Sequence, residues 1–212
     1  MNDKNLLMAH KIAERVTHSG GRVFYVGGYV RDFVMNRACK DIDIEVHGVE
    51  FPELVKILES LGQVQTMGAS FEILNLRHYE LDIALPYDIN GGTYNAALRR
   101  DFTMNALMQD VLSGEILDYF GGLDDIANHV VRAVSKKTFE LDPLRVFRAA
   151  RFAATLNFTV DDDTMKLASC VKVDSLPCER VMNELCLSLI KSREPEKFFD
   201  AAQSEYWFRE IK

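Results

Sequence analysis

The spacing of apolar residues changes once along this 212-residue chain, close to residue 140, and that change limits the folds open to it. Before it, short alternating or apolar runs are bounded by glycine pairs, which is typical of strands. One intervening segment, residues 51–61, has apolar residues at helical spacing and should pack on the sheet. The predicted strands are residues 22–26, 41–46, 63–67, 71–76 and 79–85.

From Asp142 onward, apolar residues recur at helical spacing through residues 195–202. The chain has no internal repeat and no linker rich in proline or serine, so the boundary is taken from the change in spacing. The sequence therefore predicts an α/β domain at residues 1–138, with a mixed sheet and flanking helices. An all-α domain should follow at residues 139–212.

Composition places the chain among ordinary globular proteins. Hydrophobic residues make up 48% of it, enough to bury the core of one domain and a smaller helical appendage. The four cysteines form no CxxC pair, and with five scattered histidines they make no zinc-type cluster. The N-terminus lacks a basic start followed by an apolar run, and no apolar stretch approaches roughly 18 residues. We therefore expect a cytoplasmic protein without structural zinc and without a membrane segment.

The net charge of −7 argues against a long nucleic-acid footprint on this chain, because such footprints are normally basic. Positive charge is nevertheless concentrated in two short clusters within apolar surroundings. These clusters are Arg99 with Arg100, and Arg145 with Arg148 and Arg151. Such clusters suit a local pocket for a triphosphate.

Acidic and apolar residues alternate in the segment DIDIEV, residues 41–46. Since a strand sends successive side chains to opposite faces, Asp41 and Asp43 share one face, about 7 Å apart along the strand. Two carboxylates held in this way suit Mg²⁺, which takes oxygen ligands and keeps waters and substrate phosphates. The alternative is a half-buried strand whose polar face is only solvated.

A glycine pair lies between a predicted strand and the carboxylate strand, in VGGYVRD, residues 26–32. Glycines at a strand-to-helix turn let backbone N–H groups approach a phosphate, and a helix N-terminus favours anions. Arg31, one turn later, can add positive charge. Glycine pairs alone usually make only turns, but here the turn and the carboxylates together predict a nucleotide site with a metal half and a phosphate half.

Four stretches in order resemble the class II tRNA nucleotidyltransferase and bacterial poly(A) polymerase family, part of the polymerase-β-like nucleotidyltransferases. They are GGYVRD with KDIDIEV, then RRDFTMNA (99–106), LDPLRVFRAARF (141–152) and ERV (179–181). The intervening LDYFGGLDDI is also similar to the family's link into its base-recognition region. The resemblance covers nearly the whole chain and implies a polymerase-β-like head followed by a helical neck.

The resemblance implies that Asp41 and Asp43 hold two Mg²⁺ ions, one activating the RNA 3′-hydroxyl and one steadying the leaving pyrophosphate. Asp82 is the candidate third carboxylate, because Leu81 and Ile83 take the opposite, apolar face of its strand. The alternative for Asp82 is a charge on an edge strand.

The family's nucleotide contacts can be carried over residue by residue. Gly27, Gly28 and Arg31 would cradle the triphosphate. Arg100 and Asp101 would reach the phosphates and sugar, and Asn105 would support these two residues. Asp142 and Arg145 would lie on one face of a neck helix and read the base edge, while Arg148 and Arg151 continue that face toward the phosphates. The alternative for this arginine row is a solvated or salt-bridged helix face.

Two departures from the family affect specificity. The base-reading motif usually has a glutamate directly before the aspartate, where this chain has Leu141, and Glu140 is offset by about 100° on a helix. The segment before RRD, residues 87–96, is much shorter than the flexible loop of most relatives. We therefore expect less strict nucleotide choice and poor addition of a terminal adenosine after two cytidines.

The resemblance implies an enzyme that transfers CMP or AMP from CTP or ATP to an RNA 3′ end, with tRNA favoured as acceptor. Family members usually continue into body and tail domains that hold tRNA, so a basic RNA-binding surface is expected there or on a partner chain. Two alternatives remain open. One is a small nucleotidyltransferase that modifies a non-RNA acceptor, and the other is a nucleotide-binding module or partner subunit without turnover.

Overall fold

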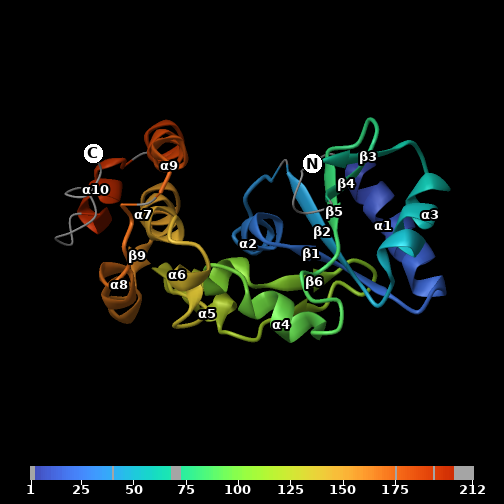
Figure 1. Ribbon diagram of the computed structural model, residues 1–212, viewed down its shortest axis with the longest axis horizontal. Helices are drawn as coiled ribbons and strands as arrows, with labels where there is room; N and C mark the ends of the chain where they lie inside the picture. The colour runs from blue at the N-terminus through green and yellow to red at the C-terminus, as the bar shows by residue number, and fades with distance from the viewer. Residues whose placement is uncertain (1–2, 40, 68–72, 175, 193, 203–212) are drawn as a thin grey trace. The chain divides into compact units, whose positions relative to one another are not determined.

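A computed structural model describes residues 3–39, 41–67, 73–174, 176–192 and 194–202 (Figure 1). The chain divides into a first unit, residues 1–98 with 105–119, and a second unit, residues 99–104 with 120–212. The predicted division after residue 138 follows a different line and stays a prediction. In the part of the chain that the structure describes, no helix combines the length and apolar character needed to cross a membrane.

The first unit is built on a seven-stranded mixed sheet with strand order β3-β4-β5-β2-β1-β6-β7. The strands are β1 (Arg22–Val26), β2 (Ile42–His47), β3 (Val64–Met67), β4 (Ile73–Leu76), β5 (Leu81–Ala84), β6 (Met108–Asp110) and β7 (Ile116–Leu117). Pairing of β2 with β5 is parallel, and the other pairs in this sheet are antiparallel. The mixed sheet with flanking helices is confirmed.

All five predicted strands are present, with ends that shift by up to two residues. Residues 71 and 72 of the predicted fourth strand lie outside the described residues. The β6–β7 hairpin was not predicted, because these strands are only three and two residues long. Its turn is held by Asp110, whose Oδ1 accepts the backbone N–H groups of Leu112 and Ser113.

Two helices cover the core of the first unit, α1 (Asp3–His18) and α3 (Phe51–Glu59), and they contact each other. Helix α1 buries Met8, Ile12 and Val16 at i, i+4 spacing, which gives it one continuous apolar stripe. The predicted helix in residues 51–61 is confirmed as α3, whose Leu54 and Leu58 are fully buried. Two shorter helices complete the unit, α2 (Gly28–Val34) and α4 (Gly92–Leu98).

The short segment at residues 87–96 is only partly a loop. The second half of this segment is helical, since α4 begins at Gly92. Gly92 has φ +66°, a left-handed conformation that suits glycine at this entry. Tyr94 of α4 packs edge-on against Tyr119 at 5.4 Å between ring centroids, and the Thr93 hydroxyl lies 2.7 Å from the Tyr119 hydroxyl.

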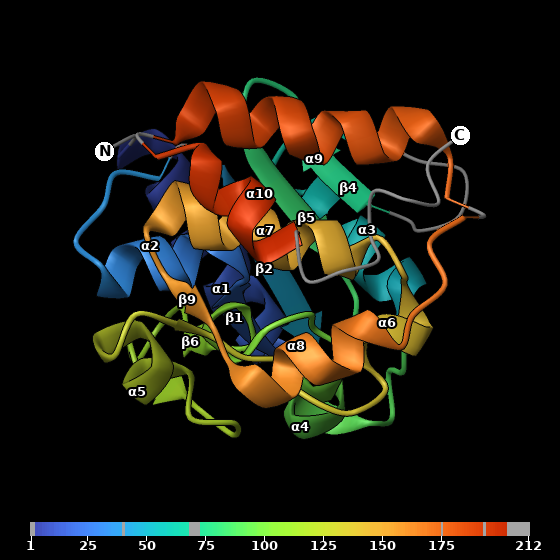
Figure 2. The same cartoon turned by 90° about the vertical axis from the view of Figure 1, so that its left-hand side faces the viewer.

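The second unit is arranged around α7 (Arg145–Leu156), which contacts both α9 (Cys178–Lys191) and α10 (Glu196–Ala202) (Figure 2). Most of the side chains of α7 are buried, including Phe147, Ala150 and Phe152. The remaining helices are α5 (Gly122–Ala127), α6 (Thr138–Leu141) and α8 (Asp162–Ser169).

The second unit is not purely helical. Strands β8 (Val130–Val131) and β9 (Thr159–Val160) form a parallel pair. Segment 99–104 joins the same unit through a bridge between Phe102 and Ala133. The predicted all-α character is therefore not confirmed. The sequence does not reveal these strands, because two-residue strands leave no alternating pattern long enough to read.

Candidate functional site

Two predicted carboxylates lie on one face of the sheet in the first unit, and the third directly precedes one of their strands. The parallel register pairs Asp43 of β2 with Asp82 of β5, and Asp41 directly precedes β2. Their strand neighbours point the other way and are buried: Ile42, Ile44, Leu81 and Ile83 are each at most 4% exposed. Asp41 and Asp82 are exposed and Asp43 is half-buried. Since β5 lies between β4 and β2, the edge-strand alternative for Asp82 is wrong.

The chemistry of this carboxylate row suits a divalent cation. Adjacent strands are about 4.8 Å apart, so carboxylates paired in register can approach the same ion. Among the described residues, no group of three or more acidic, histidine or cysteine side chains is placed to hold an ion by itself. Mg²⁺ is usually bound by one or two carboxylates and completes its shell with waters and substrate phosphates. The row therefore fits an ion that arrives with a nucleotide rather than a closed protein cage.

The glycine turn between β1 and α2 depends on one of its two glycines. Gly27 has φ 64° and ψ −133°, a conformation almost restricted to glycine. Gly28 is different, because a Cβ placed there would meet only an Arg31 Nη2 atom at 3.5 Å, which is ordinary contact. The backbone therefore requires glycine at position 27, while the predicted need for close phosphate approach at Gly28 stays a prediction.

Arg31 is held inside the first unit by two side chains. Its Nη1 donates to Asn105 Oδ1 at 2.9 Å, and its Nε donates to Asp32 Oδ1 at 2.8 Å. Arg31 is only 9% exposed and Asn105 only 5%. Asn105 therefore orients the Arg31 guanidinium, and the support predicted for it at Arg100 and Asp101 stays a prediction.

In the second unit, buried Asp101 and half-buried Arg148 form an ion pair. Asp101 Oδ2 accepts from Arg148 Nε at 2.9 Å and Nη2 at 2.6 Å, while Asp101 Oδ1 accepts the Phe102 N–H at 2.8 Å. Burial acts to lower the pKa of Arg148, but Asp101, Glu184 and Asp142 together outweigh burial and the pKa is raised. Arg148 therefore stays charged and fixed in orientation. Arg100, in the same motif as Asp101, is half-buried.

The predicted single helix carrying Asp142 and Arg145 is wrong. Helix α6 ends at Leu141, Asp142 is extended with φ −155° and ψ 107°, and α7 begins at Arg145. The cause is Pro143, since a residue before proline is disfavoured in the helical region. Asp142 instead turns the chain into α7, with its Oδ1 accepting the Leu144 N–H at 3.1 Å.

Arg145 is anchored by backbone oxygens. Its Nη1 donates to the carbonyl oxygens of Thr138 and Arg100 at 3.1 and 3.3 Å, and its Nη2 donates to the carbonyl of Arg99 at 2.8 Å. Burial lowers the pKa of Arg145, and Asp101 and Asp142 offset only part of that effect. The position where relatives have glutamate, Leu141, is 47% exposed. The guanidinium is thus held at this end of α7 without a glutamate partner from that position.

Arg151 does not share an outward-facing row with Arg145. Its Nε donates to the buried carboxylate of Glu184 on α9, and its guanidinium lies over the Phe152 ring at 4.0 Å. Glu184 also lies 4.0 Å from Arg148 Nη1. The salt-bridged alternative therefore describes Arg151 in this structure, and its contact with a phosphate stays a prediction.

Two residues of α9 that contact the predicted site were not assigned a role from the sequence. Arg180 Nη2 donates to Asp142 Oδ2 at 3.0 Å, and Glu184 pairs with Arg151. Arg180 and Glu184 lie one helical turn apart, so their side chains lie on the same side of α9. That spacing, beginning in the ERV motif, is the signal that could have identified them.

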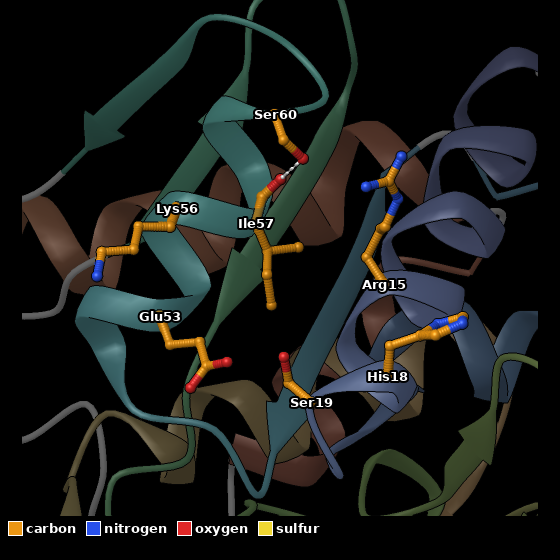
Figure 3. A pocket seen from close by; sticks show the side chains of 7 residues that line it. All are labelled: Arg15, His18, Ser19, Glu53, Lys56, Ile57 and Ser60. Carbon is orange, nitrogen blue, oxygen red and sulfur yellow. Dashed lines mark hydrogen bonds between the residues drawn. The ribbon is translucent and has the colours of Figure 1, made fainter.

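A surface pocket in the first unit lies apart from these residues. It has a volume of about 530 Å³ and is bordered by α1, Ser19 and α3. Figure 3 shows Ile57 pointing into the space between the helices, with Arg15 across from it. Its lining carries both charge signs, Lys56 and Glu53 among them, and includes none of the predicted site residues.

The two glycines of the turn allow a matched test. We expect Gly27→Ala to lower the free energy of unfolding by about 1–3 kcal/mol, because alanine must adopt a strained backbone conformation. Gly28→Ala should leave stability close to wild type. Urea denaturation of the three proteins measures the difference, and equal stability of both variants would contradict the assignment of the strained position.

Comparison with known proteins agrees with this geometry. The Poly A polymerase head domain family matches residues 23–132. The CCA-adding enzyme of Staphylococcus epidermidis (strain ATCC 12228 / FDA PCI 1200) is 31% identical over 220 residues, covering 96% of this chain and 54% of the relative. The chain thus spans about half the length of the curated relatives it matches.

Solved structures give the same result. A CCA-adding enzyme in complex with CTP superposes with a TM-score of 0.84 at 25% identity, covering 97% of this chain and 51% of that one. The Thermotoga maritima CCA-adding enzyme complexed with tRNA gives 0.83 at 26% identity, covering 95% and 51%. The chain therefore belongs to the family of the poly(A) polymerase head domain and the class II CCA-adding enzymes, and its sheet is that of a polymerase-β-like nucleotidyltransferase head.

Proposed function

We propose that this chain is the nucleotide-transferring part of a template-independent RNA nucleotidyltransferase. It would transfer CMP or AMP from CTP or ATP to an RNA 3′ end, with tRNA as the acceptor. The observation that carries this proposal is the parallel register that pairs Asp43 with Asp82 on the open face of the sheet. Relatives solved with CTP, with ATP and with tRNA support the choice of substrates.

The reaction joins the RNA 3′-oxygen to the α-phosphorus of the nucleotide and releases pyrophosphate. Asp41 and Asp43 would hold Mg²⁺, which when bound neutralises phosphate charge and lowers the pKa of the attacking 3′-hydroxyl. Asp82 would be the third carboxylate, exposed and in register with Asp43. Phosphoryl transfer needs little more from a protein than positioning and charge neutralisation.

Two glycines and three arginines would contact the triphosphate of the nucleotide. Gly27, Gly28 and Arg31 would cradle the triphosphate, and Arg100 would add to its affinity. Arg148 would do the same, because its pairing with Asp101 fixes the direction of its N–H donors.

Asp142 and Arg145 would read the base edge. Carbonyl oxygens hold Arg145 in one orientation, and Arg180 together with the Leu144 N–H holds the Asp142 carboxylate. A base is discriminated by a fixed pattern of donors and acceptors, which requires such restraint. Arg151, paired with Glu184, would act on phosphate only if that pair opens.

Three further assignments are part of the proposal. Residues 1–138 would act as the head and residues 139–212 as the neck that recognises the base. A cytoplasmic location is proposed from the cysteine pattern, since Cys39, Cys170, Cys178 and Cys186 are thiols. A partner chain or further domains would supply a basic surface for the RNA body.

The carboxylates give the direct test of the activity. Asp41→Ala and Asp43→Ala should each reduce CMP transfer by about a hundredfold or more, because metal electrostatics supply several kcal/mol of transition-state stabilisation. The assay uses labelled CTP and ATP, Mg²⁺ and tRNA lacking its 3′ end at low salt, followed by product sequencing. Glu59→Ala, an exposed acid on α3, is the control. Residual activity within tenfold of wild type in both aspartate variants would contradict the two-metal assignment.

The products of the wild-type chain define the activity further. We expect cytidines to be added and the terminal adenosine to be added poorly, since the segment at residues 87–96 is short and partly helical. A long adenosine tract would instead indicate a poly(A) polymerase. Nucleotide binding without any transfer would favour the binding-module alternative.

Base reading and triphosphate binding can be separated with two substitutions on α7. Arg148→Ala should weaken CTP and ATP binding about equally, because both nucleotides have the same triphosphate. Arg145→Ala should change the ratio of the two affinities. Titration calorimetry with both nucleotides measures this, and an unchanged ratio in Arg145→Ala would refute base reading by Arg145.

A further inference from the structure

Two residues of the first turn of α1 hold the chain where β4 turns into β5. Asn5 Nδ2 donates to the Glu80 carbonyl oxygen at 3.2 Å, and Asn5 Oδ1 accepts the Glu80 N–H at 3.4 Å. Asn5 is 1% exposed. Lys4 Nζ donates to the His78 carbonyl oxygen at 2.7 Å and lies over the Tyr79 ring at 4.7 Å.

The Asn5 amide acts toward Glu80 as a neighbouring strand would. It exchanges two hydrogen bonds with one residue, which is the pattern of a hydrogen-bonded pair in an antiparallel ladder. Glu80 directly precedes β5, so these bonds satisfy its backbone groups just outside the regular pairing. The preceding turn contains His78 at φ 72°, an uncommon conformation for a residue with a side chain. The α1 contacts therefore add to the turn's own hydrogen bond, in which the Tyr79 N–H donates to the Leu76 carbonyl oxygen at 3.0 Å.

The consequence concerns Asp82, two residues further along. Strand β5 has only four residues, Leu81–Ala84, so few ladder bonds define its register. A slip by one residue would turn Asp82 toward the core and expose Leu81 and Ile83. We infer that Asn5 is a positioning residue, which fixes the start of β5 and thereby keeps Asp82 beside Asp43 on the metal-facing side. This inference rests on the proposed role of Asp82 as the third carboxylate.

The test measures metal affinity separately from stability. Mn²⁺ binding is followed by electron paramagnetic resonance in the presence of a non-hydrolysable CTP analogue, and CMP transfer to shortened tRNA is measured in parallel. Asn5→Ala should weaken Mn²⁺ binding about tenfold and lower kcat by a similar factor, as loss of a supporting contact around a metal site does. The KM for CTP should change little, because the triphosphate contacts come from other residues.

Two further variants keep the test decisive. Ile12→Val removes a buried methyl group from the same helix while leaving the Asn5–Glu80 bonds in place, so it should lower stability without changing Mn²⁺ affinity. Asn5→Asp keeps the side-chain shape and the acceptor for the Glu80 N–H, but it loses the Nδ2 donor and should show the same loss of Mn²⁺ affinity and kcat.

Two outcomes would overturn the inference, namely Mn²⁺ affinity and kcat within twofold of wild type in both Asn5 variants, or an equal loss in Ile12→Val. An Asp82→Ala protein identifies which claim has failed. If Asp82→Ala weakens Mn²⁺ binding and the Asn5 variants do not, only the positioning role is wrong. If Asp82→Ala binds Mn²⁺ as wild type does, the proposed role of Asp82 as the third carboxylate is wrong, and the inference fails with it.

Discussion

The parallel pairing of β2 with β5 is the constraint on which the candidate site depends. Parallel strands cannot be joined by a tight hairpin, so residues 48–80 form a crossover that contains α3 and the β3–β4 pair. Once the register is set, burial of Ile44 and Ile83 on one face requires Asp43 and Asp82 to face the other way. The hydrophobic core and the carboxylate row are therefore two results of the same pairing.

Acceptors within the second unit hold the three arginines of α7 in two different ways. Asp101 neutralises Arg148, Glu184 neutralises Arg151, and carbonyl oxygens hold Arg145 without cancelling its charge. A guanidinium paired at two or more N–H groups has a defined plane, which is the property needed to recognise a planar base or a phosphate. The chain's excess of acidic residues is thus used in part to orient its few clustered arginines, and a negative net charge is compatible with a nucleotide site.

The sequence predicted the elements whose patterns are long or chemically distinct. The alternation in DIDIEV identified β2 and its carboxylates, and the glycine pair identified the turn at Gly27. Helical spacing alone places Asp142 on a helix, but Pro143 overrides it, because a residue before proline tends to leave the helical region. The sequence therefore contains the signal that ends α6 before Asp142.

Other features could not be read from local patterns. The register of Asp82 with Asp43 and the pairing of Arg180 with Asp142 join residues far apart in the chain, which no local pattern reveals. Strands β8 and β9 are too short to show alternation. The burial of Arg151 against Glu184 depends on how α9 packs on α7, and a single sequence does not define that packing.

We propose that the β2–β5 register creates a site for divalent cations that bind together with a nucleotide. Anomalous diffraction from crystals grown with Mn²⁺ and a non-hydrolysable CTP analogue is the most direct experiment. We expect a manganese peak within about 2–2.5 Å of carboxylate oxygens of Asp41 and Asp43, bridged to the nucleotide phosphates. A bound nucleotide whose metal peaks lie away from both carboxylates would contradict it.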